Sequence, residues 1–126
     1  MINSTAVSPK YIQIANKGGY VAQVDVVYEV NGSVEQQSTP QMSVGMVRKL
    51  FMPDGATNLQ FEFKMADCGW ITIGLEKFPD MGGKNMCFVM WGTIFVAQYA
   101  KVECDSPFLI VDNSKAPCWK PPAGKL

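Results

Sequence analysis

Histidine is absent from the 126-residue sequence. Imidazole is the commonest acid/base group in enzymes and the commonest metal ligand, so its absence excludes every catalytic triad that uses it. No carboxylate pair has a catalytic pattern, and no cysteine spacing resembles the C-x-x-C of zinc sites. The sequence therefore predicts a protein that is not an enzyme and has no metal and no cofactor.

An excess of either charge is also missing. Eleven Lys and Arg residues balance eleven Asp and Glu residues, and no block of like charge is longer than a pair. Nucleic-acid binding depends on clustered cations that neutralise several phosphates. Nucleic acid is therefore not expected as a partner.

Long apolar runs do not occur in the sequence. No stretch approaches the ~20 apolar residues of a membrane-spanning helix. The first residues, MINSTAVSPKYIQIA, show neither the basic region nor the apolar run of a signal peptide. Composition alone therefore leaves the cellular compartment open.

What the sequence does contain is alternation of apolar and polar residues at the period of a β-strand. In NLQFEFKM, residues 58–65, every apolar side chain falls on one face and every charged one on the other. YVAQVDVVYEV, residues 20–30, alternates in the same way, and the following Asn-Gly pair is typical of a hairpin turn. Further strands are predicted over residues 11–15, 33–38, 44–52, 71–77, 86–91, 96–102 and 108–111.

Turn residues separate these predicted strands. PDGA at residues 53–56 and PDMGGKN at residues 79–85 combine proline, which fixes φ, with glycine, which allows positive φ. Many short strands with regular turns and no helical period indicate an all-β protein, an antiparallel β-sandwich of two roughly four-stranded sheets. We expect one sandwich domain over residues 1–111 and a Pro/Lys-rich C-terminal strap and tail over residues 112–126.

Four cysteines, Cys68, Cys87, Cys104 and Cys118, allow three disulfide pairings. A bridge between Cys68 and Cys87 would close a loop of about 20 residues and contribute on the order of 3 kcal/mol. Buried free thiols are the alternative, since nothing in the sequence identifies the redox compartment. The pairing therefore stays open at this point.

The expected strand order brings two loops together. If residues 58–66, 71–77 and 86–91 are successive antiparallel strands, the loop at residues 67–70 and the loop at residues 92–95 lie at the same end of the sandwich. These two loops are therefore candidate binding loops that neighbour each other.

The direction of three side chains, Trp70, Ile94 and Phe95, determines whether these loops can contact a ligand. Strand alternation would turn either Ile94 or Phe95 inward, so at most one of them is expected to reach a ligand. Trp70 has two interpretations: a core residue beside Cys68, or an amphipathic ring exposed to a bilayer or glycan surface.

Three segments together resemble the C-terminal β-sandwich domain of the cholesterol-dependent, or thiol-activated, cytolysins. They are GYVAQVDVVYEV at residues 19–30, PDGATNLQFEFKMADCGW at 53–70 and FVMWGTIFVAQY at 88–99. Their order and spacing are comparable to those of the family, and the YVAQ and WGT motifs match it residue for residue. The resemblance covers residues 19–99 and implies the same β-sandwich fold.

In that family a Trp-rich undecapeptide loop and a Thr-Leu pair contact cholesterol-rich membrane, and this sequence departs from both. ADCGW at residues 66–70 retains the acid-Cys step but only one tryptophan, and Thr-Ile-Phe at residues 93–95 stands at the Thr-Leu pair. The resemblance implies that these positions form the ligand- or membrane-binding surface. The candidate residues are Asp67, Cys68, Gly69, Trp70, Thr93, Ile94 and Phe95.

The matched segments correspond to the membrane-binding end of the family and not to its pore-forming domains. The resemblance therefore implies a module that binds a cell surface, through membrane lipid or glycan, and forms no pore alone. The alternative is a protein-interaction or self-assembling toxin component. Such a component would form a homo-oligomer or pair with a separate pore-forming subunit. The resemblance also implies an extracellular location, although no signal peptide is visible.

Overall fold

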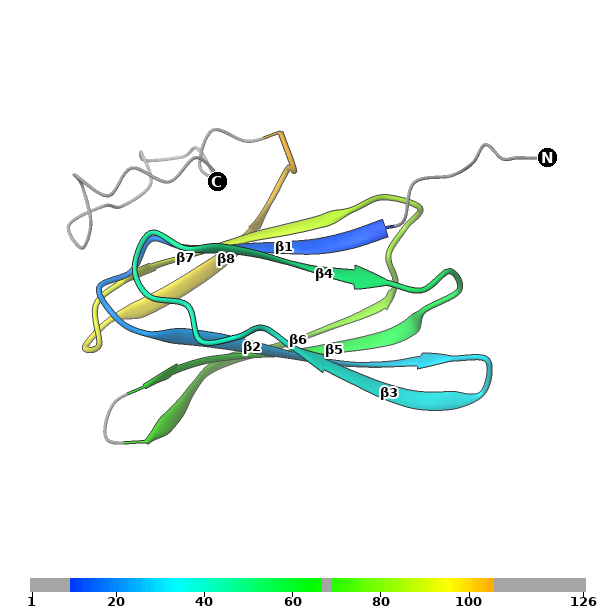
Figure 1. Cartoon of the computed structure of the whole chain (residues 1–126), viewed down its shortest axis with the longest axis horizontal. Coiled ribbons are helices and arrows are strands. Elements are labelled where there is room, and N and C mark those ends of the chain that lie inside the picture. Colours follow the sequence, from blue (N-terminus) through cyan, green and yellow to red (C-terminus); the bar gives the residue numbers. More distant parts are fainter. Residues whose placement is uncertain (1–9, 67–68, 106–126) are drawn as a thin grey trace.

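The computed structural model describes residues 10–66 and 69–105, in which eight strands form two stacked four-stranded sheets (Figure 1). This confirms the predicted all-β sandwich. Sheet 1 has the strand order β4 (Val47–Met52), β1 (Lys10–Asn16), β7 (Met86–Gly92), β8 (Ala97–Val102). Sheet 2 has the order β3 (Ser33–Ser38), β2 (Ala22–Val30), β5 (Thr57–Ala66), β6 (Trp70–Asp80).

Each strand predicted within the described residues is present, although several ends differ from the prediction. Asn31 and Gly32 form the predicted hairpin turn between β2 and β3, and both have positive φ. The strand predicted at 108–111 and the strap and tail at 112–126 lie outside the described residues. The described part of the chain contains no helix that could cross a membrane.

One strand pair departs from the antiparallel prediction. β1 and β7 run parallel, with Ile12 opposite Met86 and Asn16 opposite Met90. The chain also crosses from sheet 2 to sheet 1 between β6 and β7, so these two strands are not neighbours. The sequence did not reveal this because β7 is buried on both faces, and a continuous apolar strand does not indicate its pairing direction.

Aromatic side chains join the two sheets. The ring centroid of Phe88 on β7 lies 5.0 Å from that of Phe61 and 5.2 Å from that of Phe63, both on β5. The ring of Tyr99 on β8 stacks on Phe63 at 4.2 Å. Aromatic pairs at such distances add about 0.5–1.5 kcal/mol each beyond the burial of their surface. The alternation of β5 therefore supplies the centre of the core, as predicted.

Gly74 on β6 makes room for Tyr99. A Cβ atom at position 74 would overlap the Tyr99 ring. The Tyr99 hydroxyl donates a hydrogen bond to Oε2 of Glu76 at 2.7 Å. Burial, together with the hydrogen bond and charge of Glu76, raises the pKa of Tyr99 to about 12. The phenol therefore stays protonated and remains a donor at neutral pH.

A disulfide joins Cys87 to Cys104, with Cα atoms 5.2 Å apart. The suggested bridge between Cys68 and Cys87 is therefore wrong, and so is the free-thiol alternative for this pair. Cys87 on β7 lies opposite Val102 on β8, so Cys104 follows two residues beyond its neighbour. Only the strand register brings these two cysteines together; Cys68 and Cys118 lie outside the described residues.

Replacing both Cys87 and Cys104 by serine is expected to lower the free energy of unfolding by about 3 kcal/mol, because the bridge closes a loop in the unfolded chain. Urea unfolding followed by tryptophan fluorescence measures the change. The wild-type protein in reductant should lose a similar amount, and an unchanged unfolding midpoint in the double variant would contradict the prediction.

Gly74→Ala is expected to destabilise the protein by about 1–3 kcal/mol, because the added methyl group overlaps the Tyr99 ring. Tyr99→Ala removes that ring, so the same glycine substitution should be much less costly in the Tyr99→Ala background. A double-mutant cycle based on urea unfolding measures this coupling. Equal costs in the two backgrounds would show that the Tyr99 ring is not the obstacle.

Candidate binding surface at the tip of the sandwich

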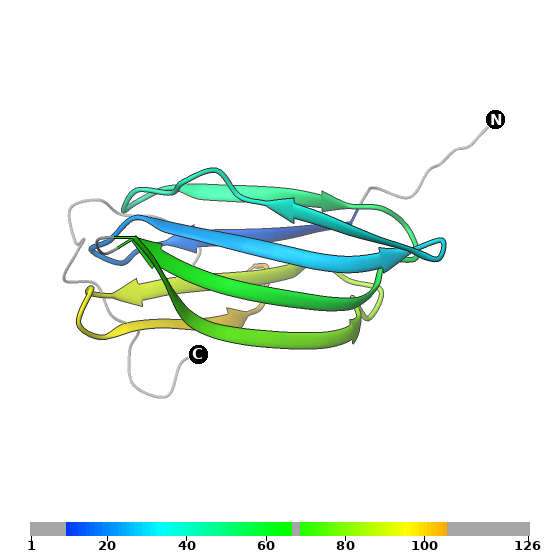
Figure 2. The same ribbon diagram turned by 90° about the horizontal axis from the view of Figure 1, so that it is seen from below.

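The described parts of the two candidate loops, residues 69–70 and 92–95, lie at the same end of the sandwich, as predicted (Figure 1, Figure 2). We call this end the tip and define it by the described residues 69–71 and 92–96. It includes the candidates Gly69, Trp70, Thr93, Ile94 and Phe95. The candidates Asp67 and Cys68 lie outside the described residues.

The connection between β1 and β2, residues 17–21, forms the base of the tip. The N–H of Gly19 donates to the carbonyl of Gly92 at 2.9 Å. The N–H of Ala66 donates to the carbonyl of Val21, also at 2.9 Å. One short segment therefore contacts the strand end that precedes each of the two loops.

Two buried polar side chains hold this base in place. The Asn16 amide donates to the carbonyls of Tyr20 at 2.8 Å and Met42 at 2.9 Å, and its oxygen accepts from the N–H of Gly18. The Tyr20 hydroxyl donates to the carbonyl of Trp91 at 2.8 Å, and burial raises the pKa of Tyr20 far above its ordinary value. The tyrosine of the YVAQ motif is thus bonded to the tryptophan of the WGT motif.

The loop between β7 and β8 is a tight turn with hydrogen bonds in both directions. The N–H of Thr93 donates to the carbonyl of Val96 at 3.2 Å, and the reverse bond measures 3.1 Å. The Thr93 hydroxyl oxygen accepts from the N–H groups of Phe95 and Val96. Gly92 has a φ of 95°, and a Cβ there would overlap the Val96 carbonyl. The turn therefore has a single well-defined shape.

This turn directs its apolar side chains outward. The exposed fraction is 88% for Phe95, 61% for Val96 and 36% for Ile94. The expectation that strand alternation would bury either Ile94 or Phe95 is wrong, because both lie in a turn and not in a strand. Both side chains are therefore available to a ligand.

Trp70 lies on the outer face of sheet 2. The pairing of β5 with β6 shifts by one residue just before the Lys64–Thr72 pair, so that Ile73 is an extra residue on β6. A bulge of this kind reverses the face on which the remaining side chains lie. Trp70 is 40% exposed, so its interpretation as a core residue is wrong.

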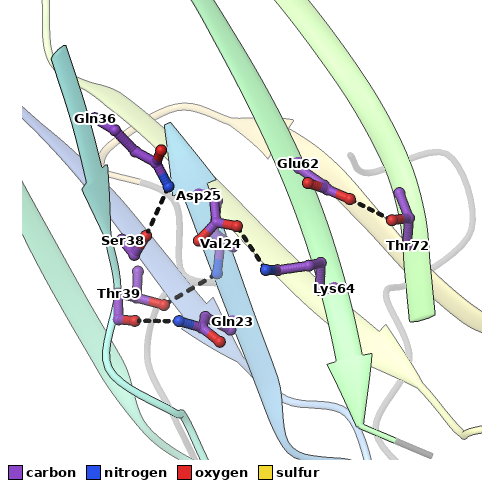
Figure 3. Close-up of polar contacts among 9 residues, drawn as sticks. All are labelled: Gln23, Val24, Asp25, Gln36, Ser38, Thr39, Glu62, Lys64 and Thr72. Atoms are coloured by element: carbon purple, nitrogen blue, oxygen red, sulfur yellow. Dashed lines mark hydrogen bonds and ion pairs between the residues drawn. The ribbon is translucent and has the colours of Figure 1, made fainter. Parts of the chain in front are cut away.

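Lys64 lies among the polar side chains on the outer face of sheet 2 (Figure 3), and it approaches the Trp70 ring. Its Nζ lies 5.8 Å from the ring centroid and 2.5 Å from Oδ2 of Asp25. Burial would raise the pKa of Asp25, but hydrogen bonds from Lys64 and Ser38 and the charge of Lys64 lower it below its ordinary value. The Asp25 carboxylate therefore stays ionised at neutral pH.

The described tip offers an apolar surface without charged groups. Within residues 10–66 and 69–105, no three Cys, Asp or Glu side chains gather as metal ligands would. Sequence reasoning did not include Ile71 and Val96, because both belonged to predicted strands. The exposed apolar side chains of the tip are Trp70, Ile71, Ile94, Phe95 and Val96.

No protein-family model matches this sequence. No curated protein matches it either. Solved structures do match it in fold. Suilysin from Streptococcus suis superimposes with a TM-score of 0.59 and 17% identity over 77% of this chain. A disulfide-locked intermedilysin mutant with human CD59 superimposes with a TM-score of 0.59 and 15% identity over 78% of this chain. Listeriolysin O superimposes with a TM-score of 0.56 and 21% identity over 75% of this chain.

This chain spans about a quarter of the length of those toxins: 24% of suilysin, 25% of the intermedilysin mutant and 22% of listeriolysin O. At such identities the comparison shows the fold alone. The fold is that of a domain of the cholesterol-dependent cytolysins, which confirms the fold implied by the sequence motifs. The binding role of the candidate residues stays a prediction.

Asp25→Asn is expected to lower the free energy of unfolding by about 1 kcal/mol at pH 7, because the ion pair with Lys64 is lost. The pKa of Asp25 is lower in the folded state, so its stabilisation is present above the unfolded pKa and disappears as the pH falls through the folded pKa. The difference between wild type and variant should therefore shrink in acid and approach zero once the Asp25 carboxylate is protonated in the folded state.

Urea unfolding at pH 7 and at low pH measures this difference. Asp54→Asn is a matched control in an exposed turn, and it should change stability by about 0.5 kcal/mol or less at either pH. A cost of Asp25→Asn that is equally large in acid would show that the ion pair is not its source.

Proposed function

We propose that this chain is a surface-binding module that attaches to lipid membranes through the tip, outside the cell and without forming a pore alone. The observation that carries the proposal is Phe95, 88% exposed at the end of a turn whose shape is set by its own hydrogen bonds. The fold shared with a cytolysin domain supports a membrane-binding role. The proposed module binds and does not catalyse a reaction.

The apolar side chains of the turn determine how strongly such a module can bind. Complete burial of a fully exposed Ile, Phe or Val side chain contributes roughly 1.5–3 kcal/mol, so the surface that Ile94, Phe95 and Val96 still expose supplies about 3–6 kcal/mol. Association costs of about 4–15 kcal/mol oppose that gain. One copy should bind weakly, and several copies on one surface would bind much more tightly.

The geometry of the tip reduces part of this cost. The turn at residues 93–96 is already ordered by hydrogen bonds at both ends, so little conformational entropy is lost when it enters a membrane. Trp70 lies at the same end of the sandwich, with an exposed ring next to Lys64. Trp and Lys side chains are typical of the headgroup layer, where one part of the side chain is apolar and the other wet.

The same turn argues against a requirement for cholesterol. Ile94 and Phe95 stand where the resembling family has its Thr-Leu pair, so the threonine of that pair has no counterpart. The hydroxyl oxygen of the preceding Thr93 already accepts two backbone hydrogen bonds. We therefore propose that the tip enters the apolar layer of a membrane whether or not a sterol is present.

One observation favours the alternative of a self-assembling or partner-binding component. β6 is an edge strand of 11 residues, and its outer edge is unpaired among the described residues. Leu75 on this strand is 67% exposed. Edge strands of this length can accept an added strand from another molecule, and such assembly would also supply the several copies that weak membrane binding needs.

Phe95→Ser is expected to reduce co-sedimentation with phosphatidylcholine vesicles about tenfold or more, because one buried phenyl side chain contributes about 1.5–3 kcal/mol. Phe51→Ser is a matched control, since Phe51 is also an exposed aromatic residue but lies on β4 at the opposite end of the sandwich. This control variant should bind as the wild type does.

Vesicles with and without cholesterol should give equal binding. The proposal fails if the folded protein binds neither kind of vesicle, or if both serine variants lose binding equally. Stable self-association in light scattering without vesicle binding would instead support the alternative component.

A further inference from the structure

A row of polar side chains lies on the outer face of sheet 2 (Figure 3), and one of them, Lys64, approaches the Trp70 ring. Asp25 on β2 is opposite Glu62 on β5. One step nearer the tip, Gln23 is opposite Lys64, which is itself opposite Thr72 on β6. The residues that alternate with them on β2 and β5 are buried in the core, so all of these side chains share the outer face.

The row places two carboxylates opposite each other, an arrangement that does not favour folding. Two carboxylates directly opposite each other on antiparallel strands repel, and Asp25 and Glu62 occupy such positions. Lys64 neutralises Asp25, and the Thr72 hydroxyl donates a hydrogen bond to Glu62. Sites that violate a local folding rule and are then supported by neighbours are frequently functional.

The hydrogen-bonding groups of this row are held in place. The side chains of Lys64 and Asp25 are only 19% and 15% exposed, and their ion pair restrains both. The Gln23 amide donates to the carbonyl of Thr39 at 3.2 Å. From Glu62 to the end of β5 the row extends about 13 Å along the strand. Such preorganisation is what a binding site for a polar ligand requires.

Trp70 ends the row because of the β-bulge at Ile73. Trp70 lies opposite Ala66, two residues beyond Lys64 on β5. Without the extra residue, strand alternation would direct Trp70 between the sheets and Ile71 outward. Bulges commonly redirect a side chain next to a functional site. Here the bulge places an aromatic ring beside the fixed polar groups.

This combination matches the chemistry of a sugar. The apolar C–H face of a sugar ring can lie against an indole ring, while its hydroxyl groups both donate to carboxylates and accept from ammonium, amide and hydroxyl groups. An anionic ligand is disfavoured, because Asp25 and Glu62 outnumber Lys64. The required ligand is neutral, rich in hydroxyl groups and apolar on one face.

We propose that the outer face of sheet 2 binds a neutral oligosaccharide, with Trp70 as the stacking platform and Asp25, Glu62, Lys64 and Thr72 as its hydrogen-bonding partners. The oligosaccharide is either the headgroup of a glycolipid or a glycan carried by protein. This site goes beyond the membrane contact of Phe95, because Asp25, Glu62 and Thr72 lie on the outer face of sheet 2 and only Trp70 and Lys64 border both surfaces.

An array of immobilised neutral oligosaccharides, probed with the full chain, tests the proposal. The wild type should bind at least one member. Trp70→Ala and Thr72→Val should each reduce that binding about tenfold or more. Gln36→Ala is the matched control, because Gln36 lies on the same face but on β3, away from Trp70. This control and Phe95→Ser should keep wild-type binding.

Urea unfolding of each variant separates lost binding from lost folding. Absence of binding to every array member by the folded wild type would overturn the proposal, as would unchanged binding by folded Trp70→Ala. Titration with the soluble form of a bound oligosaccharide, compared with vesicles carrying the matching glycolipid, then distinguishes the two sources. Binding to plain phosphatidylcholine vesicles depends on Phe95 and reports separately on the membrane contact.

Discussion

The hydrogen bond from the Tyr20 hydroxyl to the Trp91 carbonyl joins the two sheets at the tip, and the shape of the tip depends on it. Tyr20 lies in the connection that leads from β1 in sheet 1 to β2 in sheet 2. The buried Asn16 amide donates a hydrogen bond to the Tyr20 carbonyl and so holds the same connection. Because the Tyr20 hydroxyl is buried, loss of its hydrogen bond to Trp91 would lower the free energy of unfolding. The connection at residues 17–21 is therefore held in one position, and the strand ends leading into both loops bond to it.

Two surfaces of different chemistry lie at or near the tip. One is the apolar turn that carries Phe95, and the other is the polar row on sheet 2 that ends at Lys64. The turn owes its outward direction to backbone hydrogen bonds and to the positive φ of Gly92. The row owes its composition to strand alternation and a bulge. A module with both surfaces could combine a weak lipid contact with a specific polar one, which raises avidity without enlarging either.

Much of the fold followed from local pattern. The alternation in β2 and β5 and the Asn-Gly turn after β2 predicted strands, hairpin and core face correctly, because burial of one face makes a two-residue period obligatory. The common position of the two loops also followed from counting strand directions. Pairing did not follow: the parallel neighbours β1 and β7, and the bridge between Cys87 and Cys104, depend on which strands lie side by side.

The sequence by itself determined the strands, their inward faces and the end of the sandwich at which the candidate loops meet. Tertiary structure alone decided the direction of the side chains in those loops. One extra residue in β6 moved Trp70 to the outer face, and a hydrogen-bonded turn in place of a continuing strand exposed both Ile94 and Phe95. Both outcomes depend on how a strand pairs with its neighbour and where the chain turns, which a period of two residues along one strand does not contain.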